Sequence, residues 1–426
     1  MPSRASVPAP PAAREPAGWP QRVRRMRAAS GASQDEVRRH NLSRLLRRVH
    51  VAGPTSRAEL TAAMGLNRST IGALTAELVS VGLVQERLPA GHARAGRPSL
   101  VVVPESRRAY VVALDVGVDH LVAARVGLGG VLLARRQLPN HDLPVRSLTA
   151  VVDRTSRLIR SLLRSADPSG VLVGVAAAVA GAVRSRDGLV RFGPNLEWVD
   201  QPYGDMLTTR LGLGIPVAVG NDADLGALAE CRRGVAVGRA DVIYLAGEVG
   251  LGAGVISRGE ALAGAGGYAG EAGHMVVNPR GRRCRCGARG CWETEIGEEA
   301  LLRAAGRPGG GGHAAVIDVL CDAANGHRAA ARAVNSVARW LGLGVGNLVN
   351  LFNPEMVIFG GVLRHVFPAV EPIVRRALAG VALAAPREHL DLVVPGLGED
   401  SILLGAAELA FTPLLDDPLA ALAARG

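Results

Sequence analysis

The chain has 426 residues, of which 48% are hydrophobic and 20% are charged. This length exceeds one ordinary hydrophobic core and predicts two or three domains. No apolar run reaches the roughly twenty residues of a membrane helix, and the N-terminus lacks the apolar segment of a secretory signal. The sequence therefore argues against a helical membrane protein and predicts a cytoplasmic location.

The excess positive charge is confined to the first quarter of the chain. Residues 1–108 contain 18 Arg and 7 acidic residues, whereas the remaining residues contain 31 of each. There is no lysine, which we attribute to genomic composition bias. A basic segment attached to a neutral body is typical of a protein that binds the phosphate groups of nucleic acid through that segment. The alternative is a basic tail that only aids solubility.

The basic region itself divides into two parts. Residues 1–35 are expected to form a disordered basic tail, because they are rich in Pro, Ala and Arg and have no hydrophobic periodicity. Residues 36–105 predict a winged helix-turn-helix domain. Its first helix carries apolar residues at helical spacing up to Val49, and Gly53-Pro54 ends it. The next two helices are joined by a turn at Gly65, as in a helix-turn-helix.

Helix caps and a following hairpin complete this domain and define its candidate DNA contacts. Ser56 and Glu59 form a capping box for the second helix, and Asn67 or Ser69 caps the third. Strands at 83–87 and 100–103 would form the wing. The third helix would enter the major groove with its N-terminal residues on base edges. The residues expected to contact DNA are Asn67, Arg68, Ser69, Thr70 and Thr75 on that helix, and Arg94 and Arg97 in the wing.

Arginine suits both grooves of DNA. Arg68 can pair bidentately with guanine in the major groove. The extended Gly96-Arg97-Pro98 segment can place an arginine in the minor groove. The alternative for each is a solvated surface charge, and winged helices also mediate protein contacts. The local excess of positive charge favours DNA.

Residues 109–415 follow a short linker and change to an α/β pattern. The order of three strands, a helix and a strand occurs twice in weak form, which suggests two lobes around a cleft. Strands that alternate with helices predict a mostly parallel sheet. The expected strands are 110–116, 121–126, 131–135, 171–179, 215–219, 242–245, 252–256, 356–359 and 391–394, and the expected helices include 145–163, 222–232, 329–351 and 401–411.

Three of the five cysteines fall within eight residues, shortly after a histidine. One imidazole and three thiolates can supply the tetrahedral ligand set of a structural zinc site. A cysteine cluster in a cytosolic protein indicates a metal rather than a disulfide, and reduced thiols without metal are the alternative. The ion would rigidify a loop that positions Glu271, His274 and Glu293. The expected zinc ligands are His274, Cys284, Cys286 and Cys291.

Other polar motifs lie where ligands of α/β proteins bind. Asn221-Asp222 follows a strand and opens a helix, which places a carboxylate at the carboxyl end of the sheet. Asp222 can remove a proton from a hydroxyl during phosphoryl transfer, or it can simply cap the helix. Pro194-Asn195 offers an amide to a hydroxyl. The glycines of 250–254 form a turn that can approach a phosphate, which is a weak signal alone.

Together these residues resemble the ROK family of repressors, open reading frames and kinases, over residues 36–412. The most specific matches are Glu271-x-x-His274, the Cys-x-Cys-x₄-Cys run and Asn221-Asp222, and Pro194-Asn195 and Gly360-Gly361 also match. The resemblance implies a two-lobed actin/hexokinase-like sugar-kinase fold and zinc on the four ligands above. It gives Asp222 the position of the kinases' catalytic base. It implies sugar contacts from Asn195, Asn221, Asp222, Glu271, His274 and Glu293.

Two departures from the family's kinases concern the phosphate loops. The kinases' Asp-x-Gly-Gly-Thr turn corresponds here to residues 115–119, which lack the second glycine and the threonine and end in Asp119. In the second loop Glu248 replaces a threonine. Each carboxylate would repel a polyphosphate by about 1 kcal/mol or more. ATP is therefore not expected as a cofactor, and no enzyme activity is expected.

The winged helix makes the chain similar to the family's repressor branch, which includes regulators that respond to xylose, N-acetylglucosamine and glucose. The resemblance implies a homodimer or homotetramer on a palindromic operator, with a sugar or sugar derivative as effector. An ATP-dependent sugar kinase is the alternative, and a structural zinc protein with a protein-binding wing is a third possibility.

Overall fold

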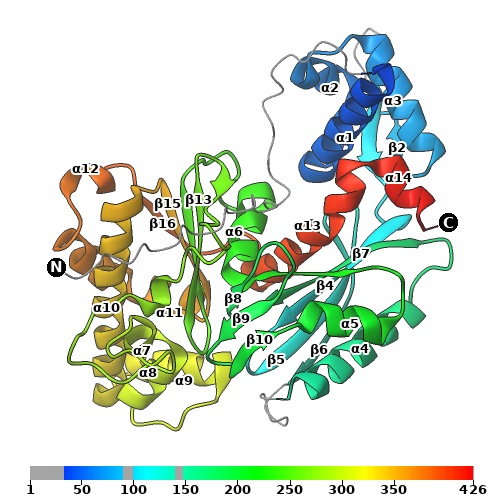
Figure 1. The fold of residues 1–426 in the computed structure, drawn as a ribbon. Helices are drawn as coiled ribbons and strands as arrows, with labels where there is room; N and C mark the ends of the chain where they lie inside the picture. The colour runs from blue at the N-terminus through cyan, green and yellow to red at the C-terminus, as the bar shows by residue number, and fades with distance from the viewer. Residues whose placement is uncertain (1–32, 90–98, 140–146, 426) are drawn as a thin grey trace, which may run out of the picture.

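The computed structural model describes residues 33–89, 99–139 and 147–425. It contains an N-terminal head and two larger lobes, each built on a five-stranded sheet (Figure 1). The predicted winged helix-turn-helix and two-lobed α/β body are both present. The expected tail up to residue 32 and the part of the wing at 90–98 lie outside the described residues.

The head contains three helices with strong start signals. Helix α1 (Gln34–Ala52) is capped by Ser33 with a capping box, so it begins slightly before the predicted boundary and takes residues 34 and 35 from the expected tail. Helix α2 (Arg57–Met64) has the predicted capping box at Ser56. Asn67 caps helix α3 (Arg68–Ser80). The strands are β1 (Thr55–Ser56), β2 (Val84–Arg87) and β3 (Val101–Pro104), in the order β1-β3-β2.

The N-lobe sheet is built from β4 (Ala109–Val116), β5 (His120–Gly127), β6 (Val131–Pro139), β7 (Val171–Val179) and β11 (Val217–Asn221). Their order is β11-β7-β4-β5-β6. Helices α4 (Leu148–Arg164) and α5 (Tyr203–Leu211) pack together beside this sheet. A small sheet follows β7 and consists of β8 (Ala182–Val183), β9 (Val190–Gly193) and β10 (Trp198–Gln201).

The C-lobe sheet repeats this plan with β12 (Val242–Gly247), β13 (Leu251–Ser257), β14 (Glu260–Ala261), β15 (Met356–Gly361) and β16 (Asp391–Val393). Their order is β14-β13-β12-β15-β16. Helices α10 (Arg328–Phe352) and α11 (Leu363–Ala379) form a large apolar core with this sheet. Smaller helices complete the lobe, namely α7 (Glu293–Ile296), α8 (Glu298–Ala304), α9 (Gly312–Ala324) and α12 (Ala384–Arg387).

Both large sheets are mixed, so the prediction of mostly parallel sheets was wrong. In the N-lobe the β4–β5 and β5–β6 pairs are antiparallel, whereas the β4–β7 and β7–β11 pairs are parallel. The C-lobe has the same division, with β12, β13 and β14 antiparallel. The physical reason is that short turns join the three successive strands, and a short turn can only connect antiparallel neighbours.

A pair of helices fills the space between the two sheets. Helix α6 (Asp222–Arg233) packs on C-lobe strands β12 and β13, and helix α13 (Ser401–Asp416) packs on N-lobe strands β4 and β7. The two helices also contact each other. A Cβ atom on Gly405 would lie 1.9 Å from the carbonyl oxygen of Leu225, so a glycine is needed for this close approach. The two lobes therefore meet through a tightly packed helix pair.

Helices α6 and α13 also contact the head, together with a short helix at the end of the described chain. Helix α13 and the short helix α14 (Pro418–Ala423) run beside α1 (Figure 1). At the centre of this contact the Glu408 carboxylate, on α13, binds three side chains. It accepts hydrogen bonds from His50 Nε2 at 3.1 Å, Arg232 Nη1 at 2.8 Å and Arg233 Nε at 2.6 Å. We call these four residues the head node. Sequence reasoning missed it.

Backbone groups of His50 and Gly129 complete the head node. Arg233 Nη1 donates to the carbonyl oxygens of His50 and Gly129, at 2.9 Å each. The Gly129 amide donates to His50 Nδ1 at 2.9 Å. Since Nδ1 accepts this bond, Nε2 carries the proton that is donated to Glu408, and the neutral ring satisfies both contacts. The head, the β5–β6 turn, α6 and α13 are thus joined at one buried point.

The head node makes stability depend on pH through His50. Burial lowers the pKa of His50, and nearby Arg233 and Arg232 act in the same direction, against the effect of Glu408. A histidine with a lowered pKa binds its proton less tightly in the folded chain. Its contribution to stability is therefore complete above the unfolded pKa of about 6.5 and is lost as the pH falls below it.

We expect acidification from pH 7.5 to 5.5 to destabilise the wild type more than His50→Gln, which has no titrating ring. The difference is limited to about 1.4 kcal/mol for each pH unit below the unfolded pKa. Urea unfolding at both pH values measures it. Equal pH dependence of the two proteins would show that His50 is not the responsible group.

No helix among the described residues is both long and apolar enough to cross a bilayer.

Candidate functional site

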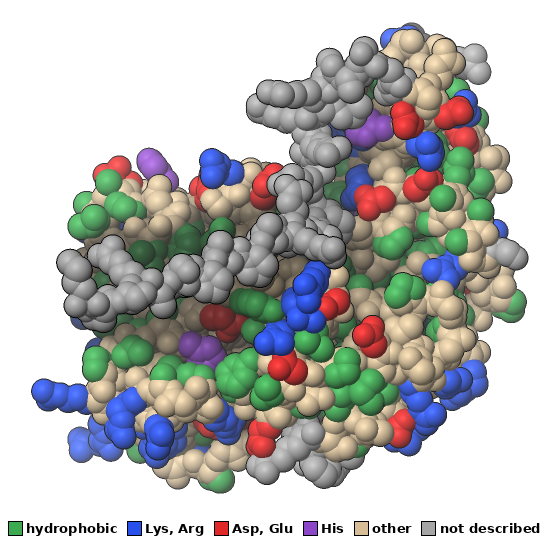
Figure 2. All heavy atoms as spheres, in the orientation of Figure 1, with side chains coloured by type: hydrophobic (Ala, Val, Ile, Leu, Met, Phe, Trp, Pro, Cys, Tyr) green, Lys and Arg blue, Asp and Glu red, His purple; other side chains and the backbone are tan. Residues whose placement is uncertain are grey.

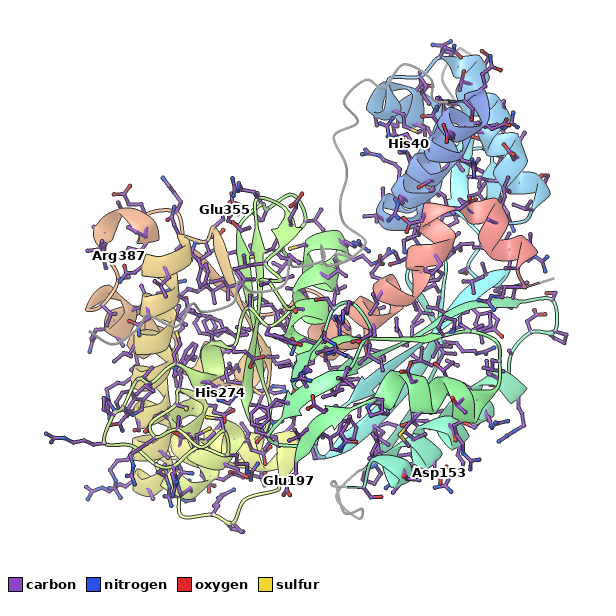
Figure 3. All side chains as sticks on the ribbon, viewed as in Figure 1. His40, Asp153, Glu197, His274, Glu355 and Arg387 are labelled. Carbon is purple, nitrogen blue, oxygen red and sulfur yellow. The ribbon has the colours of Figure 1, made fainter. Side chains whose placement is uncertain are left out.

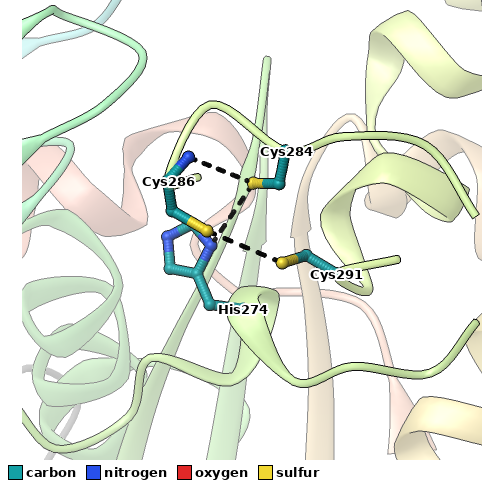
Figure 4. A group of neighbouring side chains, drawn as sticks. All are labelled: His274, Cys284, Cys286 and Cys291. Atoms are coloured by element: carbon teal, nitrogen blue, oxygen red, sulfur yellow. Dashed lines mark hydrogen bonds between the residues drawn. The ribbon is translucent and has the colours of Figure 1, made fainter. Parts of the chain in front are cut away.

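The four predicted metal ligands converge in the C-lobe. The ligand atoms of His274, Cys284, Cys286 and Cys291 all lie within 4.8 Å of one another (Figure 4). The Cys286 and Cys291 sulfurs are 3.7 Å apart, and Cys284 Sγ is 3.7 Å from His274 Nδ1. A tetrahedral ion with bonds of about 2.3 Å to sulfur requires sulfur atoms about 3.8 Å apart. The side chains therefore fit zinc in position and in ligand type.

The cysteine loop is shaped by glycines and held by a tryptophan. Gly287 and Gly290 adopt φ values of 97° and 75°, a conformation that costs glycine little. Next to Cys291, the buried Trp292 donates its indole N–H to the Trp340 carbonyl on α10 at 2.9 Å. This anchor fixes the start of α7, and Glu293 is the first residue of that helix.

All six predicted sugar-contacting residues line one cavity between the lobes. The N-lobe side contributes Asn195, from the β9–β10 turn, and Asn221, at the end of β11. Residues of the C-lobe form the opposite wall of the cavity. One of them, His274, is labelled in Figure 3. The full set is Asn195, Asn221, Asp222, Glu271, His274 and Glu293.

Asn221 and Asp222 have different tasks at the start of α6. The cap is Asn221, whose side-chain oxygen accepts from the Asp224 amide at 3.0 Å while its nitrogen donates to the Gly181 carbonyl. Asp222 accepts from the Ala223 amide and faces the cavity. Burial raises the pKa of Asp222 to about 8. The capping alternative for Asp222 is therefore wrong, and its carboxyl group is held where it can meet a ligand hydroxyl.

His274 links the metal site to the cavity. Its Nδ1 faces the cysteines and is 3.8 Å from Glu293 Oε1, whereas its Nε2 is 4.0 Å from Glu271 Oε2. Glu293 Oε1 also accepts from the Cys284 thiol at 2.9 Å. Burial raises the pKa of Glu271. One ring nitrogen is thus available to an ion while the other lies on the cavity side, next to a carboxyl group.

The carboxylates predicted to repel ATP both have histidine partners. Asp119 Oδ1 is 2.7 Å from His120 Nδ1, and Glu248 Oε2 is 3.0 Å from His313 Nε2, on α9. Burial favours the neutral form of His120, but Asp115 and Asp119 raise its pKa well above the ordinary value. The hydrogen bond to Glu248 raises the pKa of His313. These pairs weaken the simple charge argument, because each histidine offsets the charge of its carboxylate when it is protonated.

The N-terminal end of α3 presents the expected DNA-facing side chains. Asn67, Arg68 and Ser69 are exposed and Thr70 is half-buried. Thr75 was predicted to contact DNA, and the structure contradicts this. Thr75 is fully buried, and its hydroxyl donates to the Ile71 carbonyl at 2.7 Å, inside the head. Its place in the helix period puts it on the core face. Arg94 and Arg97 lie outside the described residues.

Sequence reasoning missed Arg285, whose Nη1 donates to Asn195 Oδ1 at 2.8 Å. It also missed the histidines that pair with Asp119 and Glu248. A usable signal existed for Glu408, because it is the single charged residue in the apolar stretch 401–415. Such a residue in a buried helix needs a partner.

Comparisons with known proteins cover both the body and the head. The ROK family model matches residues 111–412. The xylose repressor of Bacillus subtilis is 29% identical, over 90% of this chain and 98% of that protein. The transcriptional repressor Mlc of Escherichia coli is 26% identical over 88% and 93%. The glucokinase of Streptomyces coelicolor is 31% identical, but over only 72% of this chain and 98% of the enzyme.

Solved structures show the same division. A ROK family transcriptional regulator, described as a homologue of Mlc, superposes with a TM-score of 0.71 at 25% identity and covers 89% of this chain and 97% of its own. The Streptomyces griseus ROK glucokinase, solved with glucose and AMPPNP, has a TM-score of 0.61 at 29% identity and covers 71% and 99%. With the family model matched across the two lobes, this chain belongs to the ROK family.

Proposed function

We propose that this ROK protein is a transcriptional repressor that binds operator DNA through its head and a sugar between its lobes. The observation that carries the proposal is the extent of the similarity. Repressors match about 90% of the chain, including the head, whereas the glucokinase matches 72%. The concentration of arginine in the first 108 residues supports a nucleic acid partner. Arg68 and the other exposed residues at the start of α3 would reach base edges, with Arg94 and Arg97 in the wing.

Two copies of the head are needed to read a palindromic operator, so the proposed assembly is a homodimer or homotetramer. Cytoplasmic location follows from DNA as the partner.

Zinc is the proposed cofactor, held by His274 and the three cysteines, and its role is structural because four protein ligands leave no open position. With the cysteine loop fixed, Glu293 and His274 keep their places on the cavity wall. Glu271, Asp222 and Asn195 would accept or donate hydrogen bonds to sugar hydroxyls from the other sides.

A sugar kinase is the second candidate, because Asp222 has the position of a catalytic base in the cleft. Against it, the phosphate loops lack the kinases' threonines, and the contact between His313 and Glu248 occupies the second loop. His313 would have to move before a phosphate could approach Glu248. We propose that ATP is not used. A coupled ADP-release assay with glucose, xylose and N-acetylglucosamine tests this.

Helix α6 gives the sugar a physical route to the head. It begins at Asp222 in the cavity and ends at Arg232 and Arg233 in the head node, about 17 Å away. A sugar that closes the lobes would move α6 relative to α13. Because α1 packs against both helices, the position of the head relative to the body would change. This would change the spacing of two heads and their affinity for an operator.

The test uses an operator selected in vitro from random DNA and a panel of sugars and sugar phosphates. We expect at least one sugar to change operator affinity of the wild type. Asp222→Asn should weaken sugar binding by about threefold to tenfold, because the hydrogen bond between the carboxyl group and a sugar hydroxyl is lost, while operator affinity without sugar is unchanged. Operator binding that no sugar alters would contradict the proposal.

A further inference from the structure

A second hollow of opposite charge adjoins the sugar cavity. The two share Asn195, Val249 and Glu293. Among the described residues, the first cavity has no arginine in its lining, and its charged groups are Asp115, Asp119, Asp222, Glu248, Glu271 and Glu293, with His120 and His274. The second hollow is lined by Arg282, Arg283, Arg285 and Arg303, with Glu299 as its additional acid. A ligand that extends past Asn195 therefore passes from an acidic to a basic environment.

The guanidinium groups of the hollow are not fully neutralised. Arg285 contacts both Asn195 and Glu299. Arg303 donates to the backbone carbonyls of Thr294 and Glu299, at 2.9 and 3.4 Å. Within the described part of the chain, no carboxylate lies within 4.0 Å of the guanidinium nitrogens of Arg282, Arg283 or Arg303. Figure 2 shows arginines gathered at the lower left of the molecule, over the region of the small C-lobe helices.

A zinc ion bound by three thiolates would neutralise part of this positive charge. One Zn²⁺ with three thiolates and a neutral imidazole carries a net charge of −1, which a single arginine offsets. Glu293 and Glu299 offset two more. One positive charge then remains among the four arginines of the hollow, and Arg280 and Arg289 on the same loop add to the local potential.

We propose that the effector is a sugar that carries an anionic group, a carboxylate or a phosphate. Its ring hydroxyls would meet the acidic residues of the first cavity, and its anion would meet Arg285 and Arg303 in the second hollow. Guanidinium groups bind both kinds of anion through paired, charge-assisted hydrogen bonds. This inference names the ligand class of the repressor proposed above and rests on that function.

The test is calorimetric titration of the zinc-loaded full chain with matched sugars. D-Glucose is compared with D-glucuronate, glucose 1-phosphate and glucose 6-phosphate, and D-galactose with D-galacturonate. We expect at least one anionic sugar to bind about tenfold more tightly than its neutral counterpart, a difference that decreases with added salt. The uronates and the phosphates separate the two anion types.

The variant Arg285→Gln should reduce this preference to about twofold or less, over and above any change in neutral sugar affinity that follows from the lost contact with Asn195. Arg289→Gln is the control. It makes the same charge change on the same loop, but Arg289 donates to the Gly281 carbonyl and does not line the hollow.

The outcomes separate the two proposals. If neutral sugars bind as tightly as anionic ones, the anionic effector is wrong and the repressor proposal stands. If Arg285→Gln lowers zinc content as well, the arginine serves the metal site and the inference is overturned. Binding of no sugar at all would contradict both.

Discussion

Replacement of Glu408 by alanine is expected to destabilise the folded chain by about 3–5 kcal/mol, because it leaves buried positive charge without a partner. The Arg233 side chain is only 10% exposed and that of Arg232 25%. Burial alone would raise the pKa of Glu408, but the His50 hydrogen bond and the two arginines reverse this and hold the pKa well below its usual value. The carboxylate is therefore ionised at neutral pH and fully engaged.

A matched control is Glu371→Ala. Glu371 pairs with Arg375 one turn away on α11, but both side chains are at least 40% exposed. Surface pairs of this kind contribute about 0–1 kcal/mol. Urea unfolding of both variants measures the difference. Similar, small losses for the two would mean that the head node does not hold the head to the body.

The Glu408 variant should also uncouple the two proposed functions. The carboxylate does not line the cavity between the lobes, so sugar affinity should stay within about threefold of the wild type. The sugar-dependent change in operator affinity should largely disappear, because α6 no longer reaches the head through a fixed contact. Glu408→Gln, which keeps the shape and removes the charge, separates the loss of packing from the loss of the ion pairs. A full sugar response in Glu408→Ala would exclude this route.

Replacement of Cys291 by serine is expected to abolish stoichiometric zinc and weaken sugar binding by about tenfold to a hundredfold. Cys291 is completely buried, and Glu293 lies two residues beyond it. Zinc binding to small structural sites is worth on the order of 10 kcal/mol, comparable to the roughly 5–15 kcal/mol net stability of a typical domain. Loss of the ion should therefore loosen the loop that positions Glu293 and His274.

The control for this change is Cys321→Ser, the same substitution at an exposed cysteine on α9 outside the metal cluster. We expect zinc content by atomic emission, sugar affinity and thermal stability to remain as in the wild type. A Cys291→Ser protein that binds sugar normally without zinc would show that the loop does not depend on the metal.

Much of this protein could be predicted from short stretches of sequence. The capping box at Ser56 and the cap at Asn67 specify where helices start, since caps act within three residues. The His274 and cysteine spacing predicts a metal site for the same reason, because all four ligands lie within eighteen residues. The arginine excess near the N-terminus indicates a phosphate-binding head without any knowledge of the fold.

Single residues show where local reasoning fails. Thr75 was assigned to DNA because it follows the N-terminal residues 67–70 of the helix by about one turn, but core packing sets which face of the helix turns inward, and Thr75 lies on that face. The strands were located well, but their direction depends on how connections fold back. The mixed sheets therefore emerged only in three dimensions.

The helix starts, the metal ligand set and the separation of charge could be read from the amino-acid sequence, because each depends on neighbours along the chain. The head node and the basic hollow beside the cavity between the lobes depend on tertiary packing. His50 and Glu408 are 358 residues apart and Asn195 and Arg285 are 90 apart. Such contacts form only when the lobes and head have packed, since no local pattern encodes the distance between remote segments.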